Sequence, residues 1–416
     1  MNLSQAEEIL KKHNQEHILS FWNKLEENEK SSLLEQVENI DFNLLDELYK
    51  LATSNNDKKL DNISPLSAIK KDELENVEYL TCVGEKSIKE GKLAFVTMAG
   101  GQGTRLGFNG PKGAYILDVN NNKSLFELLC DTLKDARKKY NVTIPWYIMT
   151  SRENNKQTMD FFKDNDFFDY GKENIFFFVQ GEMPMLLENG RCVLETCGKI
   201  KEASDGHGGV FKALGKSKAL QDMKRRKVKW IFIGGVDNCL LKMVDPLLIG
   251  LCENGNYLLA SKTITKRNPE EKVGVFCKSN GRPYVIEYSE ISEDMANLRD
   301  EKKNLVYGQS HILCNMFNIE LLDRMKDSPL PYHVAHKKTN YIDEKGNECV
   351  PDKPNAYKFE SFIFDAFGMA EDILLLETKR EEEFAPVKNS EGEDSPETAL
   401  KLLNEYRNLV GENNNV

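Results

Sequence analysis

Apolar residues recur every three or four positions along the first 90 residues, with charged side chains between them. The stretch AEEILKKHNQEHILSFWNKL, which begins at Ala6, is an example. This spacing places the apolar side chains on one face of a helix and is typical of amphipathic helices. We therefore expect residues 1–90 to form a helical segment that packs on a larger domain.

The pattern changes after Lys92, where the short apolar run LAFVTMA leads into a cluster of glycines. A run of this kind is typical of a buried strand that enters a loop. The helical spacing of SLFELLCDTLKDARKKY follows behind a serine that can cap the helix, and TIPWYIMT then predicts a second strand. The alternation continues with the expected strands NIFFFVQ, VKWIFIGGVDN and YLLASKTI, and with the expected helices GVFKALGKSKALQDM and PLLIGLCENG.

Strands that alternate with helices predict an α/β fold, with a mostly parallel, mixed sheet covered by helices on both faces. Ligands bind such sheets beyond the carboxyl ends of the strands. Between about residues 270 and 320, the closely spaced segments VGVFCK, PYVIEYSEI and SHILCNMF predict strands that extend the sheet, and EDMANLRDEKK predicts a helix. We expect a main domain over residues 91–385 and a short C-terminal segment over 386–416, with one helix in ETALKLLNEYRNLV.

Charge and composition limit the partners of this chain. The formal net charge of -11 argues against a surface that neutralises nucleic-acid phosphates. The first 20 residues show no apolar core of an export signal, and the chain has no apolar run of the length that spans a bilayer as a helix. Nine scattered cysteines are typical of reduced thiols. We expect a cytoplasmic protein that binds small molecules, with no nucleic acid and no membrane among its partners.

The glycine cluster carries the most specific chemistry in the sequence. It reads MAGGQGTRLG from Met98 to Gly107 and is followed by Pro111 and Lys112. Glycines allow the backbone to turn sharply and to bring N–H groups against phosphate oxygens. Arg105 and Lys112 add positive charge, so the segment predicts a phosphate-binding loop.

Common nucleotide and hydrolase motifs do not fit the chain. The GKS at Gly215 lacks the earlier glycine of a Walker A loop, because Val210 stands in its place. Leu106 occupies the third glycine position of a dinucleotide fingerprint, which weakens a dehydrogenase interpretation. The sequence also has no GxSxG elbow and no HExxH motif.

Several motifs in a fixed order resemble the eukaryotic UDP-N-acetylglucosamine pyrophosphorylases, within the wider UDP-sugar pyrophosphorylase family. GGQGTRLG with a following PK is similar to that family's nucleotide signature, whereas the related UDP-glucose enzymes typically have a GGLGTxMG loop. The resemblance extends from about Lys92 to Lys388 and includes ASDGHGGVFKAL, GGVDNCLLKMVDP, VGVFC, VIEYSEIS, LPYHVAHKK, PDKPNAYKFESFIFD and REEEFAPVKN. It implies a nucleotide-diphospho-sugar transferase-like fold of the GT-A-like type.

The resemblance implies a magnesium-dependent nucleotidyltransferase. UTP and N-acetylglucosamine 1-phosphate would give UDP-N-acetylglucosamine and pyrophosphate by in-line attack. The attacking phosphate is already an anion, so the enzyme needs alignment and charge neutralisation rather than a general base. The catalytic cations implied are Arg105, Lys112, Lys358 and Lys388.

The resemblance also assigns ligand contacts. The nucleotide would be bound by Met98, Ala99, Gly100, Gly101, Gln180, Gly206 and Asp237. Gln180 and Gly206 resemble positions that recognise uracil. Asp237 resembles the carboxylate that holds Mg2+, which prefers oxygen ligands and commonly uses one or two carboxylates beside phosphates and waters.

A third set of positions resembles the sugar pocket. It consists of His207, Gly274, Glu287, Tyr288, Asn315, Phe362 and Phe364. The two phenylalanines alternate on an expected extended segment, and such alternation is core packing at least as often as ligand contact. His207 is a departure, because the family usually has Asn beside this glycine.

Three other interpretations stay open on the sequence. The same chemistry could act on another sugar 1-phosphate, such as that of N-acetylgalactosamine, glucose or galactose. A non-catalytic protein would bind UDP-sugars without releasing pyrophosphate. An NAD-dependent oxidoreductase is the third alternative.

Overall fold

The computed structural model describes residues 1–54 and 62–411. The chain forms two compact units, and each is assembled from segments that are far apart in the sequence. The first unit comprises Met1–Lys59, Gly181–Gly209 and Leu330–Phe362. The second comprises Leu60–Gln180, Val210–Pro329 and Ile363–Val416.

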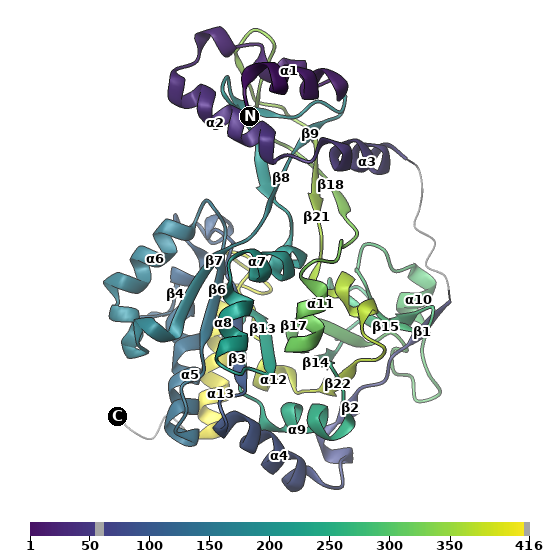
Figure 1. Ribbon diagram of the computed structural model, residues 1–416. Coiled ribbons are helices and arrows are strands. Elements are labelled where there is room, and N and C mark those ends of the chain that lie inside the picture. The colour runs from purple at the N-terminus through teal and green to yellow at the C-terminus, as the bar shows by residue number, and fades with distance from the viewer. Residues whose placement is uncertain (55–61, 412–416) are drawn as a thin grey trace. The chain divides into compact units, whose positions relative to one another are not determined.

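The second unit is built on one large mixed sheet (Figure 1). Among the described residues it has 11 strands in the order β2-β22-β14-β17-β13-β3-β6-β7, with β15, β16 and β1 branching from β17. Strands β13, β3, β6 and β7 run parallel, and β17 is antiparallel to β13, β14 and β15. The strands are β1 (Ile63–Pro65), β2 (Ile69–Lys70), β3 (Leu93–Met98), β6 (Trp146–Thr150), β7 (Ile175–Val179), β13 (Trp230–Gly235), β14 (Leu259–Thr265), β15 (Val275–Ser279), β16 (Arg282–Ile286), β17 (Gln309–Asn318) and β22 (Leu374–Glu377), and a separate hairpin joins β4 (Ile116–Asp118) to β5 (Lys123–Ser124).

Helices cover both faces of this sheet. They are α4 (Val77–Lys89), α5 (Leu125–Tyr140), α6 (Asn155–Asp164), α7 (Val210–Lys216), α8 (Ala219–Arg225), α9 (Pro246–Gly255), α10 (Glu293–Asn297), α11 (Ile319–Met325), α12 (Arg380–Glu383) and α13 (Pro396–Val410). Side chains alternate between faces along a strand. Met316 of β17 belongs to the core that includes Leu248 of α9, whereas Phe317 packs against Phe211 of α7, with ring centroids 5.5 Å apart. The predicted α/β architecture with helices on both faces is confirmed.

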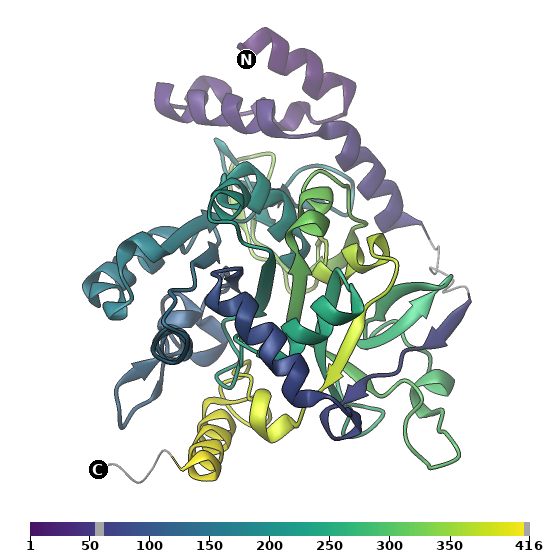
Figure 2. The same cartoon turned by 60° about the horizontal axis from the view of Figure 1, so that its bottom comes forward.

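Helices α4 and α9 cross at two glycines and lie side by side in both views (Figure 1, Figure 2). A Cβ on Gly84 would lie 1.8 Å from the carbonyl oxygen of Pro246. A Cβ on Gly250 would lie equally close, 1.8 Å, to the carbonyl oxygen of Leu80. The helices can approach this closely only because neither position carries a side chain.

The local pattern predicted most elements of the second unit, with three differences. The single helix expected over residues 209–223 is two helices, because Lys218 adopts a left-handed conformation between α7 and α8, with φ +66°. The helix expected over EDMANLRDEKK ends at Asn297, where the next residue is extended. Within residues 1–90, which were expected to be helical, β1 and β2 pair with β15 and β22.

The first unit joins three helices to several short strands. They are α1 (Leu3–Lys12), α2 (Glu27–Asn39), α3 (Phe42–Thr53), β8 (Glu182–Pro184), β9 (Leu186–Leu187), β10 (Leu194–Thr196), β11 (Lys199–Ile200), β12 (Glu202–Ser204), β18 (His333–Lys337), β19 (Tyr341–Ile342), β20 (Glu348–Cys349) and β21 (Ala356–Glu360). Leu10 and Leu33 of the helices share a core with Leu186, Ile200 and Phe359 of the strands.

Two glutamines fasten the helical segments of the first unit to its strands. Gln15 donates to the carbonyl oxygen of Gly190 at 2.9 Å and accepts from the amide of Cys192 at 2.9 Å. Gln36 makes the same pair of bonds with the backbone of Ile200. Each side chain thereby satisfies a backbone donor and a backbone acceptor, as a neighbouring strand would. In the described part of the chain, no helix is long and apolar enough to cross a lipid bilayer.

Candidate functional site

The glycine loop follows β3, the strand that lies between β13 and β6 in the sheet. Gln180 follows the carboxyl end of the nearby strand β7, and its backbone amide donates to the carbonyl oxygen of Thr150 at 2.8 Å. The Gln180 side chain lies on Gly100, where a Cβ would be 2.7 Å from Oε1 of Gln180. A side chain on residue 100 would displace the Gln180 amide, and the structure thus brings together a predicted loop residue and the predicted uracil contact.

The loop is held in a folded conformation by its own backbone. Lys112 donates its amide to the carbonyl oxygen of Gly101 at 3.1 Å, and Gly103 donates to Gly110 at 2.8 Å. Gly107 adopts a left-handed conformation with φ +69°, which favours glycine. Arg105 lies in the short helical turn of this loop and is exposed.

Asn154 supports the glycine loop through hydrogen bonds to its backbone. The sequence interpretation missed this residue. Its side chain is fully buried, and its Nδ2 donates to the carbonyl oxygens of Ala99 at 2.9 Å and of Gly101 at 3.2 Å. Its Oδ1 accepts from the amide of Ser151 at 2.9 Å. The only sequence signal for this role is its position just after the carboxyl end of the second expected strand, where ligand loops of such sheets gather.

Asp237 follows the carboxyl end of β13 and faces a lysine of the loop. Its Oδ2 lies 3.6 Å from Nζ of Lys112, and 26% of its side chain is exposed. Burial raises the pKa of Asp237, but the charges of Lys112 and Lys388 outweigh burial and hold the pKa below its ordinary value. Three residues that were predicted separately therefore share one electrostatic environment.

The charge of Lys388 acts on Asp237 because the backbone before Lys388 is bound to the segment after β13. Val387 donates its amide to the carbonyl oxygen of Asp237 at 2.9 Å. Asn238 donates to the carbonyl oxygen of Glu383 at 2.7 Å and accepts from the amide of Ala385 at 2.9 Å. The Lys388 ammonium group itself lies 3.4 Å from a carboxylate oxygen of Asp394.

A buried ion cluster fixes the start of the same segment. Nζ of Lys262 is 2.6 Å from Oε2 of Glu383 and 2.8 Å from Oδ2 of Asp245, and the Lys262 side chain is fully buried. Burial lowers the pKa of Lys262, but the two carboxylates outweigh it and raise the pKa above its ordinary value. The lysine is therefore charged, and it holds Glu383 in place.

The predicted sugar positions of the second unit lie along β15, β16 and β17. Glu287 follows β16, and its side chain lies close to Gly274. A Cβ placed on Gly274 would be 3.2 Å from Oε1 of Glu287. The carbonyl oxygen of Gly274 accepts from the amide of His311 at 2.9 Å. Asn315 lies four residues further along β17 and is fully buried, whereas Tyr288 is 49% exposed.

Phe364 is a core residue of the second unit. The extended segment expected around it ends at Glu360, and Phe364 lies in a 3-10 helix over Ile363–Met369. Its ring packs edge-on against His311, with centroids 5.4 Å apart. Phe364 therefore supports a residue beside the predicted sugar positions.

Four predicted residues belong to the first unit. Gly206 has a φ of +87°, and a Cβ there would be 2.2 Å from the carbonyl oxygen of Ser361, so only glycine fits. The rings of His207 and Phe362 lie 5.2 Å apart. Lys358 is paired with Glu360, with Nζ 2.8 Å from Oε1.

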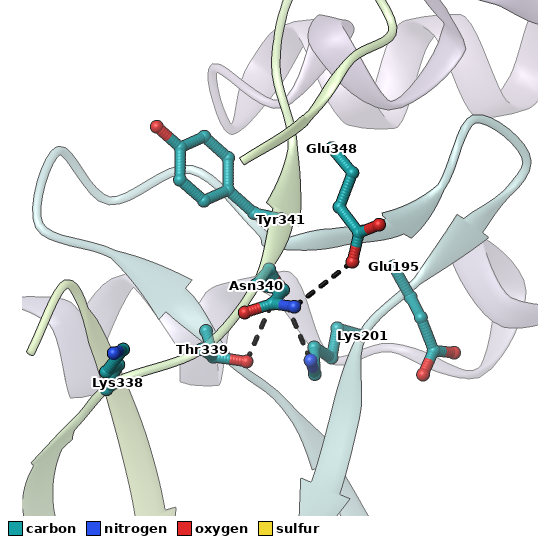
Figure 3. A pocket seen from close by; sticks show the side chains of 7 residues that line it. All are labelled: Glu195, Lys201, Lys338, Thr339, Asn340, Tyr341 and Glu348. Atoms are coloured by element: carbon teal, nitrogen blue, oxygen red, sulfur yellow. Dashed lines mark hydrogen bonds between the residues drawn. The ribbon is translucent and has the colours of Figure 1, made fainter. Parts of the chain in front are cut away.

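The first unit also has a polar pocket of about 500 Å³ (Figure 3). Asn340 donates to Glu348 at 3.1 Å, and its carbonyl oxygen accepts from Lys201 at 3.4 Å. The pocket is lined by Glu195, Lys201, Lys338, Thr339, Asn340, Tyr341 and Glu348. None of these seven is a predicted site residue, so the pocket is not assigned to the candidate site.

A metal at Asp237 would find few other protein ligands. Within residues 1–54 and 62–411, no three His, Cys, Asp or Glu side chains form a group that could hold a metal ion. All nine cysteines are unpaired thiols. The donor set fits a hard cation that takes one carboxylate from the protein and its remaining oxygens from phosphates and water.

Known proteins resemble most of this chain. The sequence profile of the family described as UTP–glucose-1-phosphate uridylyltransferase matches residues 42–412. UDP-N-acetylglucosamine diphosphorylase 2 of Arabidopsis thaliana is 36% identical over 422 residues, covering 95% of this chain and 82% of that protein. UDP-N-acetylhexosamine pyrophosphorylase-like protein 1 of Homo sapiens is 39% identical over 77% of this chain, which spans 65% of the length of the human protein.

A solved structure supports the same relationship. The uridine diphosphate N-acetylglucosamine pyrophosphorylase of Trypanosoma brucei, solved with an inhibitor, superimposes with a TM-score of 0.80. It is 30% identical, and the match covers 95% of this chain and 82% of the other. The chain therefore belongs to the UDP-sugar pyrophosphorylase family and is a relative of its UDP-N-acetylglucosamine pyrophosphorylases.

Proposed function

We propose that this protein is an enzyme that transfers the uridylyl group of UTP to N-acetylglucosamine 1-phosphate and releases pyrophosphate. The names of its relatives support this activity. The single observation that carries the proposal is the grouping of Asp237, Lys112 and Lys388 at the carboxyl end of β13, next to the glycine loop. Such an arrangement suits a polyphosphate, because it supplies fixed cations and one carboxylate for a metal.

The reaction requires charge neutralisation and alignment. A phosphate oxygen of the sugar 1-phosphate attacks the α-phosphorus of UTP, and the bond from that phosphorus to the pyrophosphate oxygen breaks in line. The attacking oxygen carries a negative charge, so no proton has to be removed. Lys112 and Lys388 would neutralise the phosphates, and Arg105 and Lys358 would add further cations when the substrates bind.

The ligand contacts follow the same proposal. Gln180 would pair with the uracil edge through its amide, with Gly206 allowing close backbone approach. The sugar would be bound by His207, Gly274, Glu287, Tyr288, Asn315, Phe362 and Phe364. Glu287 suits a sugar hydroxyl because a carboxylate accepts hydrogen bonds from it.

Asp237 would hold Mg2+, which takes oxygen ligands and leaves several sites for phosphate and water. Its depressed pKa supports this role, because the carboxylate stays ionised when cations surround it. When bound, the metal would stabilise the negative charge that develops on the phosphates. We propose a cytoplasmic site for the reaction, since the nine free thiols suit a reducing compartment.

One assay tests the proposed function. Purified protein, UTP and Mg2+ are incubated with N-acetylglucosamine, N-acetylgalactosamine, glucose or galactose 1-phosphate, and pyrophosphate is measured. We expect the highest kcat/KM with N-acetylglucosamine 1-phosphate and no release when metal is removed by chelation. Binding of UDP-sugar without pyrophosphate release from any sugar would identify a non-catalytic protein instead.

Removal of the Lys112 charge is the first variant to test. Lys112→Met should lower kcat by about 100-fold or more, because a preorganised charge that stabilises the transition state is lost. Lys134→Met, at another lysine of this unit, is the matched control and should retain full turnover. A folded Lys112→Met protein with unchanged kcat would refute the assignment of the loop.

A further inference from the structure

The Asn315 amide of β17 is buried, and only one side of it is used by the protein. The side chain has 0% exposure. Its Oδ1 lies 3.0 Å from the hydroxyl oxygen of Ser261 and shares that hydroxyl hydrogen with the carbonyl oxygen of Cys314, which is also 3.0 Å away. Oδ1 also lies 3.2 Å from Nε2 of His311. Its Nδ2 has no hydrogen-bond partner within the described residues. A buried donor without a partner is costly, so its retention indicates a bonding group that the protein itself does not supply.

A bulge in β17 brings His311 and Asn315 together. Asn315 pairs with Ser261 and His311 pairs with Thr263, so the register shifts between these two positions. Leu313, inside the bulge, has a φ of +56°. Residues four apart on a regular strand would lie about 13 Å from each other. The bulge shortens this separation and lets the imidazole reach the amide, as bulges near functional sites commonly redirect side chains.

Aromatic packing fixes the His311 ring. The rings of Phe276 and Phe364 each lie 5.4 Å away and Phe367 lies 5.8 Å away, all close to perpendicular to the imidazole. Oδ1 of Asn315 can only accept, so Nε2 of His311 must carry a hydrogen for the contact to be a hydrogen bond. With that hydrogen on Nε2, His311 holds the amide with Oδ1 toward itself and Nδ2 turned away.

We propose that His311 is a positioning residue which, together with Ser261, locks Asn315 so that its amide donors face the sugar. This inference rests on the proposed function. A hydroxyl can donate or accept and pairs with either orientation of the amide, whereas an acetamido carbonyl can pair only with the donor side. The lock therefore favours N-acetylated sugar 1-phosphates over their 2-hydroxy counterparts.

The test compares two substitutions of His311. His311→Phe keeps an aromatic ring among Phe276, Phe364 and Phe367 but removes the donor, whereas His311→Gln keeps an N–H group. We compare kcat/KM for N-acetylglucosamine 1-phosphate with kcat/KM for glucose 1-phosphate. The ratio of the first to the second should fall about tenfold in His311→Phe, because KM for the N-acetylated sugar rises. His311→Gln should keep the ratio within about threefold, and KM for UTP should not change in either variant.

Other outcomes separate this inference from the proposed function. A wild-type protein that is inactive on every sugar 1-phosphate would refute the proposed function. The lock would be refuted if the His311→Phe protein were active and kept the wild-type ratio. It would also be refuted if kcat/KM fell equally for both sugars and KM for UTP changed. His336→Phe, at an exposed histidine of β18, is the matched control and should keep the ratio.

Two further measurements apply if His311→Phe does not fold. Ser261→Ala removes the second donor to Oδ1 and should lower the same ratio, and an unchanged ratio would refute the lock. Calorimetry gives a readout independent of turnover. Ser261→Ala should weaken binding of UDP-N-acetylglucosamine more than binding of UDP-glucose. A loss of affinity that is the same for both UDP-sugars would also refute the lock.

Discussion

At the scale of single residues, Asn154 and Asn315 use buried amide groups in opposite ways. Asn154 places both of its side-chain atoms in hydrogen bonds with backbone groups, two of them carbonyl oxygens of the glycine loop. Among the residues that the structure describes, Asn315 pairs only its oxygen. An amide with every bond made inside the protein supports structure, whereas one with an unused donor offers it to a ligand. The first therefore shapes the glycine loop, and the second has a donor free for the sugar contact that we propose.

Substitution of Asn154 should weaken nucleotide binding. Asn154→Ala leaves the carbonyl oxygens of Ala99 and Gly101 without their buried donor, which costs about 1–3 kcal/mol and loosens the loop. We expect kcat/KM for UTP to fall about 10- to 100-fold, with little change in KM for the sugar 1-phosphate. Steady-state kinetics with each substrate varied would measure this.

The control for that prediction is Gln157→Ala, an exposed position of α6. It should leave both KM values unchanged. Equal kinetics for Asn154→Ala and Gln157→Ala would show that the loop keeps its conformation without the Asn154 amide.

At the scale of elements, the helix α13 is joined to the hairpin β4–β5, which follows the glycine loop in sequence. Arg407 of α13 lies 2.7 Å from Oδ2 of Asp118 at the end of β4, and only 3% of the Asp118 side chain is exposed. Asn121 also donates to Asp118 at 2.9 Å. Burial raises the pKa of Asp118, but the bonds from Asn121 and Arg407 outweigh it and lower the pKa below its ordinary value. The pair thus ties the last described helix to the hairpin.

Asp118→Asn should destabilise the protein in a pH-dependent way. At pH 7 the free energy of unfolding should fall by about 1.5–3 kcal/mol, because Arg407 loses its charged partner. A lowered folded-state pKa gives stability that is complete above the ordinary Asp value of about 3.9 and is lost as the pH falls through the folded value. The difference between wild type and Asp118→Asn should therefore shrink below about pH 4.

Urea unfolding at pH 7, 5 and 3.5 measures this difference. Asp135→Asn, at an exposed position of α5, should have no effect at any of these values. A constant difference across the range would mean that Asp118 acts through packing and not through its charge.

At the scale of the whole molecule, sequence order and spatial order differ. The predicted order of a helical N-terminal segment, a main domain and a C-terminal segment follows the local pattern, whereas the first unit combines three separate stretches of chain. The reason is burial. The apolar faces of α1 and α2 are covered by Leu186, Ile200 and Phe359, which come from the other two stretches.

Removal of residues 1–54 should therefore unfold the rest of the first unit. The deletion exposes Leu186, Ile200 and Phe359 to water, and the remaining short strands cannot form a core alone. We expect the shortened chain to bind a hydrophobic dye and to be cleaved by protease within residues 181–209 and 330–362. The full-length Leu51→Asp variant, changed at an exposed position of α3, should resist both. A shortened chain as resistant as the full-length one would contradict this view of the first unit.

The sequence alone determined those features that depend on neighbouring residues. Apolar periodicity predicted the strands and helices of the large sheet, and the glycines predicted a turning loop after β3, because amphipathic spacing and backbone freedom are local properties. Phosphate binding by this loop, with Arg105 and Lys112, stays a prediction. The motif resemblance also predicted that Asp237 and Lys388 belong to one site, and the structure gives them a common electrostatic environment.

Only the tertiary structure decided how distant segments meet. Asn238 binds the segment before Lys388, Asn154 supports the loop, and the bulge at Leu313 brings His311 to the Asn315 amide. These contacts depend on strand register and on partners far away in the chain, which no local pattern specifies. The grouping of three stretches into one unit likewise follows from which apolar faces cover one another, and that is settled only when the whole chain has folded.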